Sequence, residues 1–267
     1  MISTAGRLKA REYLDALAAA GRYHFALSDA QTEMGVSTAA LKVALGRQAQ
    51  QHLIASPARG FYVVVPPEYR SLRCLPADQF IPALMQSRRL PYYAGLLTAA
   101  QYYGAAHQRP QAFQVFLEKP RRPIVCGKVR VVFLVRKHAG EVPARSFNTP
   151  RGSVLVSTPE ATALDLVGYQ HQAGGLNHVA NVLAELAEQI DTATLATTAA
   201  SAPVAWAQRL GYLLERVGAT EKASALKAHV RAHAREATAL VPRAPRRKAA
   251  HVQDWKLYAN AELELDQ

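Results

Sequence analysis

Residues Ser28–Val65 read SDAQTEMGVSTAALKVALGRQAQQHLIASPARGFYVVV, and this stretch decides the fold of the N-terminal part of the chain. Ser28 is a candidate cap for a short helix over residues 29–34, which Gly35 is placed to end. Ser37 is a candidate cap for a second helix that runs to about residue 51. Two short helices joined by a glycine-containing turn are typical of a helix-turn-helix.

A hairpin follows the second helix directly. It consists of Leu53–Ile54, a turn over Ser56–Gly60, and the β-rich run Phe61–Val65. A hairpin in this position is a wing, so the stretch predicts a winged helix-turn-helix that binds duplex DNA. The alternative is an ordinary helical hairpin with a solvated outer face. The occurrence of turn, helix and wing in this order favours the DNA-binding interpretation.

The second helix separates into two faces at 100° per residue. Leu41 and Leu45 share one face, and the opposite face combines small residues with two cations and an amide. The N-terminal part of such a helix usually contacts base edges, and more distal cations contact phosphates. The base-reading candidates are Thr38, Ala39, Lys42 and Val43. The phosphate candidates are Arg47, Gln50 and the wing residue Arg59, and the cap Ser37 completes the predicted DNA-binding set.

Length and composition indicate a chain of two domains. The 267 residues are 49% hydrophobic, which is ample for folded cores. We expect residues 1–70 to form the DNA-binding domain and residues 71–267 a larger domain, with Pro66–Pro67 closing the first. No apolar run approaches the roughly 18 residues of a membrane span, and no signal peptide is evident, so a cytoplasmic protein is expected.

The second domain is predicted to be α+β, with a small sheet near its start and a helical C-terminal half. Strands are expected at 113–117, 129–135 and 153–156. Helices are expected at 78–88 (capped by Asp78), 92–104, from a Ser157/Glu160 capping box to about 172, and at 177–189, 191–199, 204–217 and 220–237. A final strand is expected at 255–258.

The net charge of +12 is unevenly spread along the sequence. It divides into +3 for residues 1–70, +9 for 71–140, −3 for 141–220 and +3 for 221–267. A basic surface in the second block would extend a DNA footprint or meet an acidic or RNA-linked partner, and a generally basic protein is the plain alternative. The basic candidates are Arg88, Arg89, Lys119, Arg121, Arg122, Lys128 and Arg130.

Several segments occur in a distinctive order over about 200 residues. They are RGFY at 59–62, PYYAGLLTAA at 91–100, Gly104, AHQ at 106–108, FQV at 113–115, STPEATALDLV at 157–167, QRLGYLL at 208–214, and Trp255 with Asn260. In these segments the chain resembles the AbiEi-type antitoxins of abortive-infection (AbiE) systems. It departs at Ala49, where a leucine is usual, and at His52, where a glycine is usual.

The resemblance implies a cytoplasmic type IV antitoxin of antiviral defence. Its N-terminal domain would repress its own operon by binding an inverted repeat in the promoter. Its C-terminal domain would counteract a nucleotidyltransferase-like toxin encoded beside it, and the seven basic candidates would contribute to that antitoxin surface. A ligand-responsive winged-helix transcription factor with a C-terminal sensor domain is the alternative function.

No residue pattern supports an enzyme, a metal site or a cofactor. His229 and His233 have zinc-ligand spacing, but Val230 stands where a zincin needs its glutamate. Glu118 and Lys119 are adjacent, so a strand would point them to opposite faces. Cys74 and Cys126 are far apart in sequence and are expected to be reduced bystanders. Asp165, in an apolar helix face, is expected to be solvated or paired with a buried cation such as Arg209.

Overall fold

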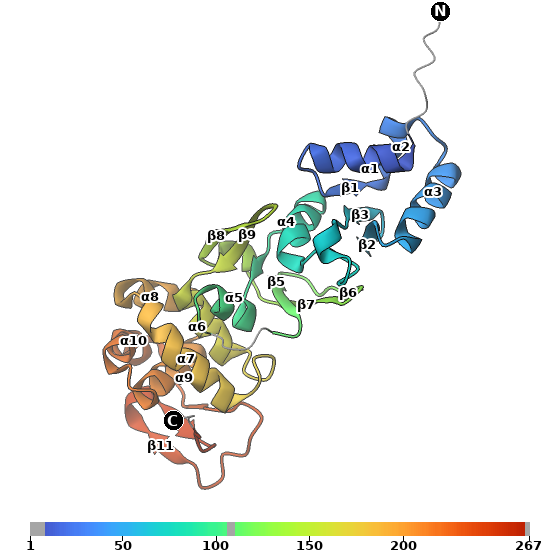
Figure 1. The fold of residues 1–267 in the computed structure, drawn as a ribbon. Helices are drawn as coiled ribbons and strands as arrows, with labels where there is room; N and C mark the ends of the chain where they lie inside the picture. Colours follow the sequence, from blue (N-terminus) through green and yellow to red (C-terminus); the bar gives the residue numbers. More distant parts are fainter. Residues whose placement is uncertain (1–8, 106–109, 265–267) are drawn as a thin grey trace, which may run out of the picture. The chain divides into compact units, whose positions relative to one another are not determined.

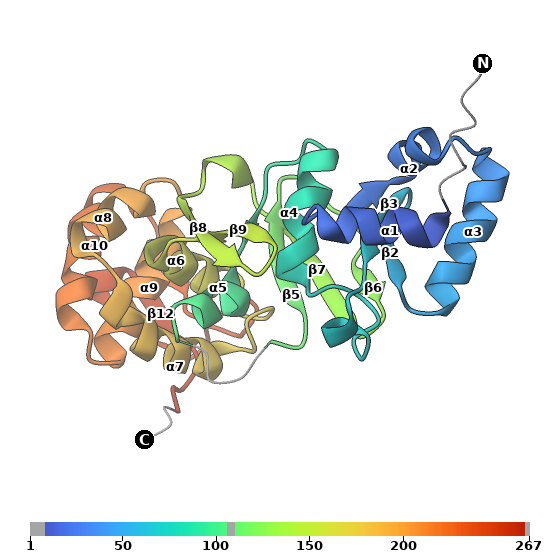
Figure 2. The same cartoon turned by 45° about the horizontal axis from the view of Figure 1, so that its top comes forward.

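The computed structural model describes residues 9–105 and 110–264, so the AHQ segment at 106–108 lies outside the described residues. The chain forms two compact units, each shown in Figures 1 and 2. Unit 1 comprises Met1–Tyr92, Gln111–Arg136 and Ser146–Val154. Unit 2 comprises Tyr93–Pro110, Lys137–Arg145 and Leu155–Gln267.

The N-terminal part of unit 1 has the helices and the wing of a winged helix-turn-helix, as predicted. Its elements are α1 (Ala10–Ala19), β1 (His24–Ala26), α2 (Leu27–Met34), α3 (Thr38–Gln50), β2 (Ile54–Ala58) and β3 (Phe61–Val64). The three strands form an antiparallel sheet in the order β1-β3-β2. The overall α+β class is therefore confirmed.

The turn between α2 and α3 is built as the sequence indicates, with one correction at its start. Gly35 ends α2 in the left-handed conformation at φ 62°, which only glycine adopts without strain, and Ser37 caps α3. Helix α2 begins at Leu27 rather than Asp29, because the Asp29 carboxylate accepts from the backbone N–H of Ala26 at 3.4 Å. Asp29 therefore satisfies the helix start from inside the helix, and Ser28 is not the cap.

The wing turn is shorter than predicted. Strand β2 continues through Ser56, and its register with β3 shifts between Ala55 and Ala58. The shift is a β-bulge, which accommodates Pro57 because proline has no N–H to donate to the ladder. The turn itself is reduced to Arg59–Gly60, with Gly60 at φ 75°.

Strand β3 is buried on both faces. Phe61 and Val63 pack in a core with α4 and strands β5 to β7, together with Val65 just beyond the strand. Val64 and the half-buried Tyr62 pack in the other core, against α1, α2 and α3. Unit 1 thus has two hydrophobic cores that share one strand.

The rest of unit 1 confirms two predicted strands and adds one. Its elements are the 3-10 turn η1 (Pro67–Tyr69), α4 (Ala77–Ser87), β5 (Phe113–Leu117), β6 (Ile124–Cys126) and β7 (Val129–Val135). Strands β5 and β7 pair in parallel, and the short β6, missed from the sequence, pairs antiparallel with β7. Pro76 rather than Asp78 occupies the N-cap position of helix α4, and Asp78 lies in its first turn.

Unit 2 is mainly helical. Its elements are β4 (Tyr93–Ala94), α5 (Leu96–Tyr102), η2 (Ala139–Glu141), α6 (Pro159–Gly168), α7 (Leu176–Leu186), η3 (Ala187–Gln189), α8 (Thr192–Ala199), α9 (Val204–Arg216), α10 (Thr220–His233), β10 (Thr238–Ala239), β11 (Ala250–Val252), η4 (Gln253–Trp255) and β12 (Leu257–Ala259). Strands β8 (Ala144–Thr149) and β9 (Gly152–Ser157) have residues in both units. The last three strands form a sheet in the order β10-β12-β11.

Two helices of unit 2 end earlier than predicted, α6 at Gly168 rather than about residue 172 and α10 at His233 rather than residue 237. Three predicted starts also need correction. The helix expected at 92–104 starts only at Leu96, because residues 93–94 form strand β4, which pairs with β9. The capping box at the start of α6 is wrong. Thr158 is the cap, and the Glu160 carboxylate accepts from the backbone N–H of Asp191 at 2.9 Å. The C-terminal strand begins at Leu257, after a 3-10 turn that contains Trp255.

The compact units divide the chain differently from the predicted boundary at residue 70. Residues 71–92 and strands β5 to β7 belong to the same unit as the winged helix. That residues 1–70 and 71–267 act as separate functional domains stays a prediction.

The buried hydroxyl of Tyr13 yields a stability test. Tyr13 is 1% exposed, its ring packs edge-on against Phe25, and its hydroxyl has no hydrogen-bond partner among the described residues. Burial raises the pKa of this phenol to about 12. We expect Tyr13→Phe to stabilise the protein by about 1 kcal/mol, because an unsatisfied buried hydroxyl is removed without a change of shape. Thermal unfolding of the full chain measures this.

Tyr69→Phe is the matched control. The Tyr69 hydroxyl accepts from the side-chain amide of Gln79 at 2.9 Å, so its loss should destabilise the protein by about 1 kcal/mol. A Tyr13→Phe variant that loses as much stability as Tyr69→Phe would contradict the structure around Tyr13.

Candidate nucleic-acid interface

Helix α3 presents most of the predicted DNA-binding residues on one side. Leu41 and Leu45 are 0% and 2% exposed and pack α3 into the smaller core of unit 1, which it forms with α1 and α2. In both views α3 lies at the edge of the winged helix, with its outer side away from β2 and β3 (Figures 1 and 2). The exposed predicted residues on α3 and its cap are Ser37, Thr38, Ala39, Lys42, Val43, Arg47 and Gln50.

The two hydroxyls at the start of α3 serve the helix-turn-helix geometry. The Ser37 hydroxyl accepts from the backbone N–H of Ala40 at 3.3 Å and satisfies one free donor of the helix end. The Thr38 hydroxyl donates to the side-chain carbonyl of Gln31 on α2 at 3.0 Å. The first contact caps α3, and the second joins the start of α3 to α2. Ala39, Lys42 and Val43 are then the next side chains along the outer face.

The electrostatics of this unit favour an anionic partner. The thirteen residues of α3 include two cations and no carboxylate. Unit 1 carries 18 Lys and Arg against 7 Asp and Glu, a net charge of +11, whereas unit 2 carries 14 against 13, a net +1. Nearly all of the excess positive charge of the chain therefore belongs to the unit that contains the winged helix.

The basic residues predicted for a second surface also belong to unit 1. The Arg88 guanidinium, at the end of α4, donates to the backbone carbonyl of Arg59 at 2.6 Å. The structure thus brings Arg88 to the tip of the wing, next to a predicted phosphate contact. The other six candidates also lie within unit 1, just after α4, in the β5–β6 segment or in the β6–β7 hairpin.

A further arginine, which sequence reasoning missed, fastens the β8–β9 hairpin to the winged helix. The Arg151 guanidinium lies 4.1 Å from the ring centre of Tyr23 and 5.2 Å from that of Tyr69. It donates to the carboxylate of Glu68 at 2.6 Å and to the side-chain carbonyl of Gln79 at 2.8 Å. Its side chain is only 12% exposed. Nothing in the local sequence around this turn distinguishes Arg151 from a solvated arginine.

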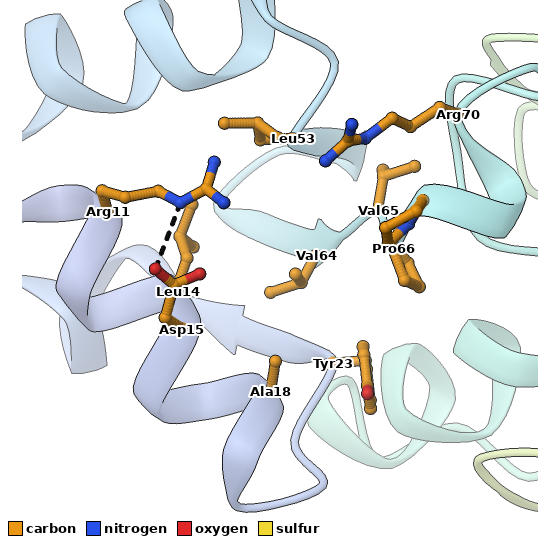
Figure 3. Close-up of a pocket in the computed structure, with 11 residues that line it drawn as sticks. Arg11, Leu14, Asp15, Ala18, Tyr23, Leu53, Val64, Val65, Pro66 and Arg70 are labelled. Atoms are coloured by element: carbon orange, nitrogen blue, oxygen red, sulfur yellow. Dashed lines mark hydrogen bonds and ion pairs between the residues drawn. The ribbon is translucent and has the colours of Figure 1, made fainter.

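A pocket of about 300 Å³ lies in the winged helix, between α1, β3 and the segment that follows β3 (Figure 3). Its floor is apolar and includes Leu14, Leu53 and Val64. At its rim, Arg11 pairs with Asp15 at 3.2 Å. None of the predicted DNA-binding residues line the pocket. It also lies outside residues 71–267, where the ligand-responsive alternative places its sensor.

The two cysteines come together in the larger core of unit 1, although they are far apart in sequence. Both thiols are buried, and a hydrogen bond with Cys126 together with burial raises the pKa of Cys74. The backbone N–H of Lys128 donates to the carbonyl of Leu72 at 2.8 Å, which holds the two segments in place. The raised pKa keeps the Cys74 thiol protonated and unreactive at neutral pH.

The residues that carry the family resemblance in unit 2 have structural roles. Gly211 packs directly under the Trp255 ring, where any side chain would clash. The Gln208 amide donates to the backbone carbonyls of Trp255 and Lys256, and Asn260 bridges the backbone N–H and carbonyl of Val241. These residues fix the C-terminal segment onto α9.

The buried polar residues of α6 and α9 also have defined partners. The Tyr93 hydroxyl donates to the Asp165 carboxylate at 2.8 Å. Arg209 donates to the carbonyl of Ala239 and the hydroxyl of Thr238, not to the expected carboxylate.

No metal or membrane element is found in the described part of the chain. His229 and His233 stack at 4.4 Å, but no group of three or more potential metal ligands occurs among residues 9–105 and 110–264. Within the same ranges, no helix has the length and apolarity needed to cross a membrane.

Comparison with known proteins identifies one family domain within the chain. Residues 93–216 match the family model of the AbiEi antitoxin C-terminal domain. The crystal structure of the RV2827C protein from Mycobacterium tuberculosis is similar over 93% of this chain and 90% of that chain, with a TM-score of 0.66 and 16% sequence identity. At that identity the likeness shows a shared fold. No curated protein matches the sequence significantly.

The Arg151 contacts lead to a stability prediction. We expect Arg151→Ala to destabilise the protein by about 2–3 kcal/mol, because charge-assisted hydrogen bonds and ring stacking are lost together. The stability of Arg151→Lys should lie between those of wild type and Arg151→Ala, since an ammonium group cannot reproduce the planar, forked hydrogen bonding of a guanidinium. Arg130→Ala, which removes an exposed arginine of the same unit, should be nearly neutral. Thermal unfolding at pH 7 ranks the three variants.

The stability that the Arg151–Glu68 contact contributes should decrease in acid. The pKa of Glu68 lies below its usual 4.5, through a hydrogen bond with its own backbone and then the bond from Arg151. A lowered acid pKa stabilises the fold above the unfolded value, and that contribution is lost as pH falls through the folded value. The stability gap between wild type and Arg151→Ala should therefore narrow below about pH 4. A gap that widens in acid would contradict the Glu68 contact.

Proposed function

We propose that the chain is an AbiEi-type antitoxin that represses its own operon and counteracts a toxin encoded beside it, a proposal supported by the match of residues 93–216 to the AbiEi antitoxin C-terminal domain. The DNA-binding half of this proposal rests on the winged helix of unit 1. The antitoxin half rests on the family domain. The proposed toxin is a nucleotidyltransferase-like enzyme, and the proposed system is of type IV.

The observation that carries the DNA-binding half is the outer face of α3. A helix held by two buried leucines presents Lys42, Val43 and Arg47 to solvent without a neighbouring carboxylate on the helix. A major groove accepts such a helix, and cations at its flanks neutralise phosphates. The wing arginine Arg59 is exposed and supplies a second phosphate contact. An inverted repeat in the promoter is the proposed operator.

The proposal is tested with the full chain and two measurements. Gel-shift titrations with DNA from its own promoter should give binding that falls by about 0.9 log unit per log unit of salt for each phosphate contacted. Co-expression with the neighbouring gene should restore growth that the neighbour alone arrests. Promoter binding without growth rescue would indicate a regulator that is not an antitoxin. Growth rescue without promoter binding would contradict the proposed autorepression.

The division of labour on α3 gives a second prediction. Lys42→Ala should weaken operator binding by about 1–3 kcal/mol and relax the preference at one base position. Arg47→Ala and Arg59→Ala should weaken operator and random DNA alike and reduce the salt slope by about one each. Equal losses by all three variants on both DNAs would contradict separate base and phosphate roles.

A third prediction separates rescue from repression. We propose that the basic turn between β5 and β6 contributes to antitoxicity, since the toxin's nucleotide or RNA substrates are anionic. Arg121→Glu with Arg122→Glu should impair rescue from a toxin supplied independently and leave an operator-driven reporter repressed. Lys42→Ala with Arg47→Ala should do the reverse. Full rescue by the charge-reversed pair, at normal protein level, would remove this turn from the mechanism.

A further inference from the structure

Val43 is a large apolar side chain held in solvent by α3. It is 58% exposed, and the other exposed large hydrophobics in the described part of the chain lie on β6, β7 and β9. The side chain contributes little to either core of unit 1. Its neighbours on the outer face are Lys42 and Arg47, so an apolar spot sits between two cations.

Gly46 lies three residues after Val43, on the same outer face. A Cβ built on Gly46 meets no atom within 4 Å, and its backbone is ordinary helix. Glycine destabilises a helix interior relative to alanine. The fold of this chain therefore offers no reason for a glycine at position 46. Because Gly46 has no side chain, another molecule can approach α3 closely beside Val43.

The charges around this spot select its occupant. Helix α3 has no carboxylate, and the unit carries a net +11, so a polyanion is favoured at the rim. At the centre the occupant must offer an apolar group. The major groove of duplex DNA provides both, because the 5-methyl group of thymine is the apolar feature on its floor and phosphates line its edges.

We propose that Val43 reads a thymine methyl in the major groove and that Gly46 permits the close approach that this contact requires. The inference rests on the proposed DNA-binding function and names the base feature recognised. It assigns Gly46, which lies outside the predicted contact set, a role in fit rather than in hydrogen bonding.

The test removes the methyl groups and leaves base pairing intact. Promoter DNA is made with either dTTP or dUTP, and the full chain is titrated on both at one salt concentration. Wild type should bind the uracil DNA more weakly, by about four-fold for each methyl that it buries. Val43→Ala should lose a similar factor on thymine DNA and show no further loss on uracil DNA.

Val125→Ala is the matched control. Val125 is 69% exposed on β6 of the same unit, so its removal deletes an exposed valine of the same kind and should leave the full preference for thymine DNA. Gly46→Ala should raise the melting temperature of the protein while weakening operator binding about ten-fold or more, since a methyl at this position would meet the DNA. A variant that is more stable but binds DNA more weakly would show that Gly46 serves DNA binding and not folding.

The possible outcomes distinguish failure of this inference from failure of the proposed DNA binding. Failure of wild type to bind either DNA would overturn the proposed DNA binding. Equal wild-type affinity for thymine and uracil DNA, or a thymine preference that survives Val43→Ala, would overturn the role of Val43 and leave DNA binding standing. Wild-type affinity in Gly46→Ala would overturn the close approach. Loss of growth rescue in Val43→Ala with unchanged DNA binding would make this face a protein-docking surface instead.

Discussion

The two-sided burial of strand β3 is the constraint on which unit 1 depends. Alternate side chains of a strand point to opposite faces, so Val64 enters the small core while Phe61 and Val63 enter the larger one. A wing in a free-standing domain has one face in water. Here that second face is covered by α4 and the strands β5 to β7. The wing is therefore a shared wall between two cores, and its geometry is set from both sides.

The fold around this shared wall also accommodates many cations, because unit 1 has a net charge of +11. Like charges repel, so cations near the wing are favourable only where the fold gives them partners. Arg151 is enclosed by two tyrosine rings, a carboxylate and an amide, and Arg88 is bound to a backbone carbonyl at the wing tip. Lys42 and Arg47 remain on the exposed face of α3. The cations of unit 1 thus divide into those that hold the wing and those available to an anionic partner.

The sequence predicted the parts of the fold that local signals determine. Gly35 and Ser37 bound their helices, because backbone conformation and capping are properties of a few adjacent residues. The run Phe61–Val65 also indicates a strand that is buried on both faces, since an unbroken apolar run is typical of such strands. The Arg151 contacts and the Cys74–Cys126 pair join segments more than 50 residues apart, and no local pattern specifies such pairings. Of the candidate site, exposure along α3 follows from helical period, whereas the placement of Arg88 at the wing does not.

The matched family domain and the compact units overlap without coinciding, and this has a consequence for mechanism. Residues 93–216 include strands β5 to β7, whose Val115, Leu117 and Val131 share a core with Phe61 and Val63 of the wing. A substitution inside that core changes the family domain and the wing together, because packed cores transmit changes of volume. Core variants therefore cannot assign the proposed repression to one part of the chain and the proposed antitoxicity to another. Only substitutions that leave both cores intact, such as those of exposed arginines in the β5–β6 turn or on the outer face of α3, can separate the two proposed activities.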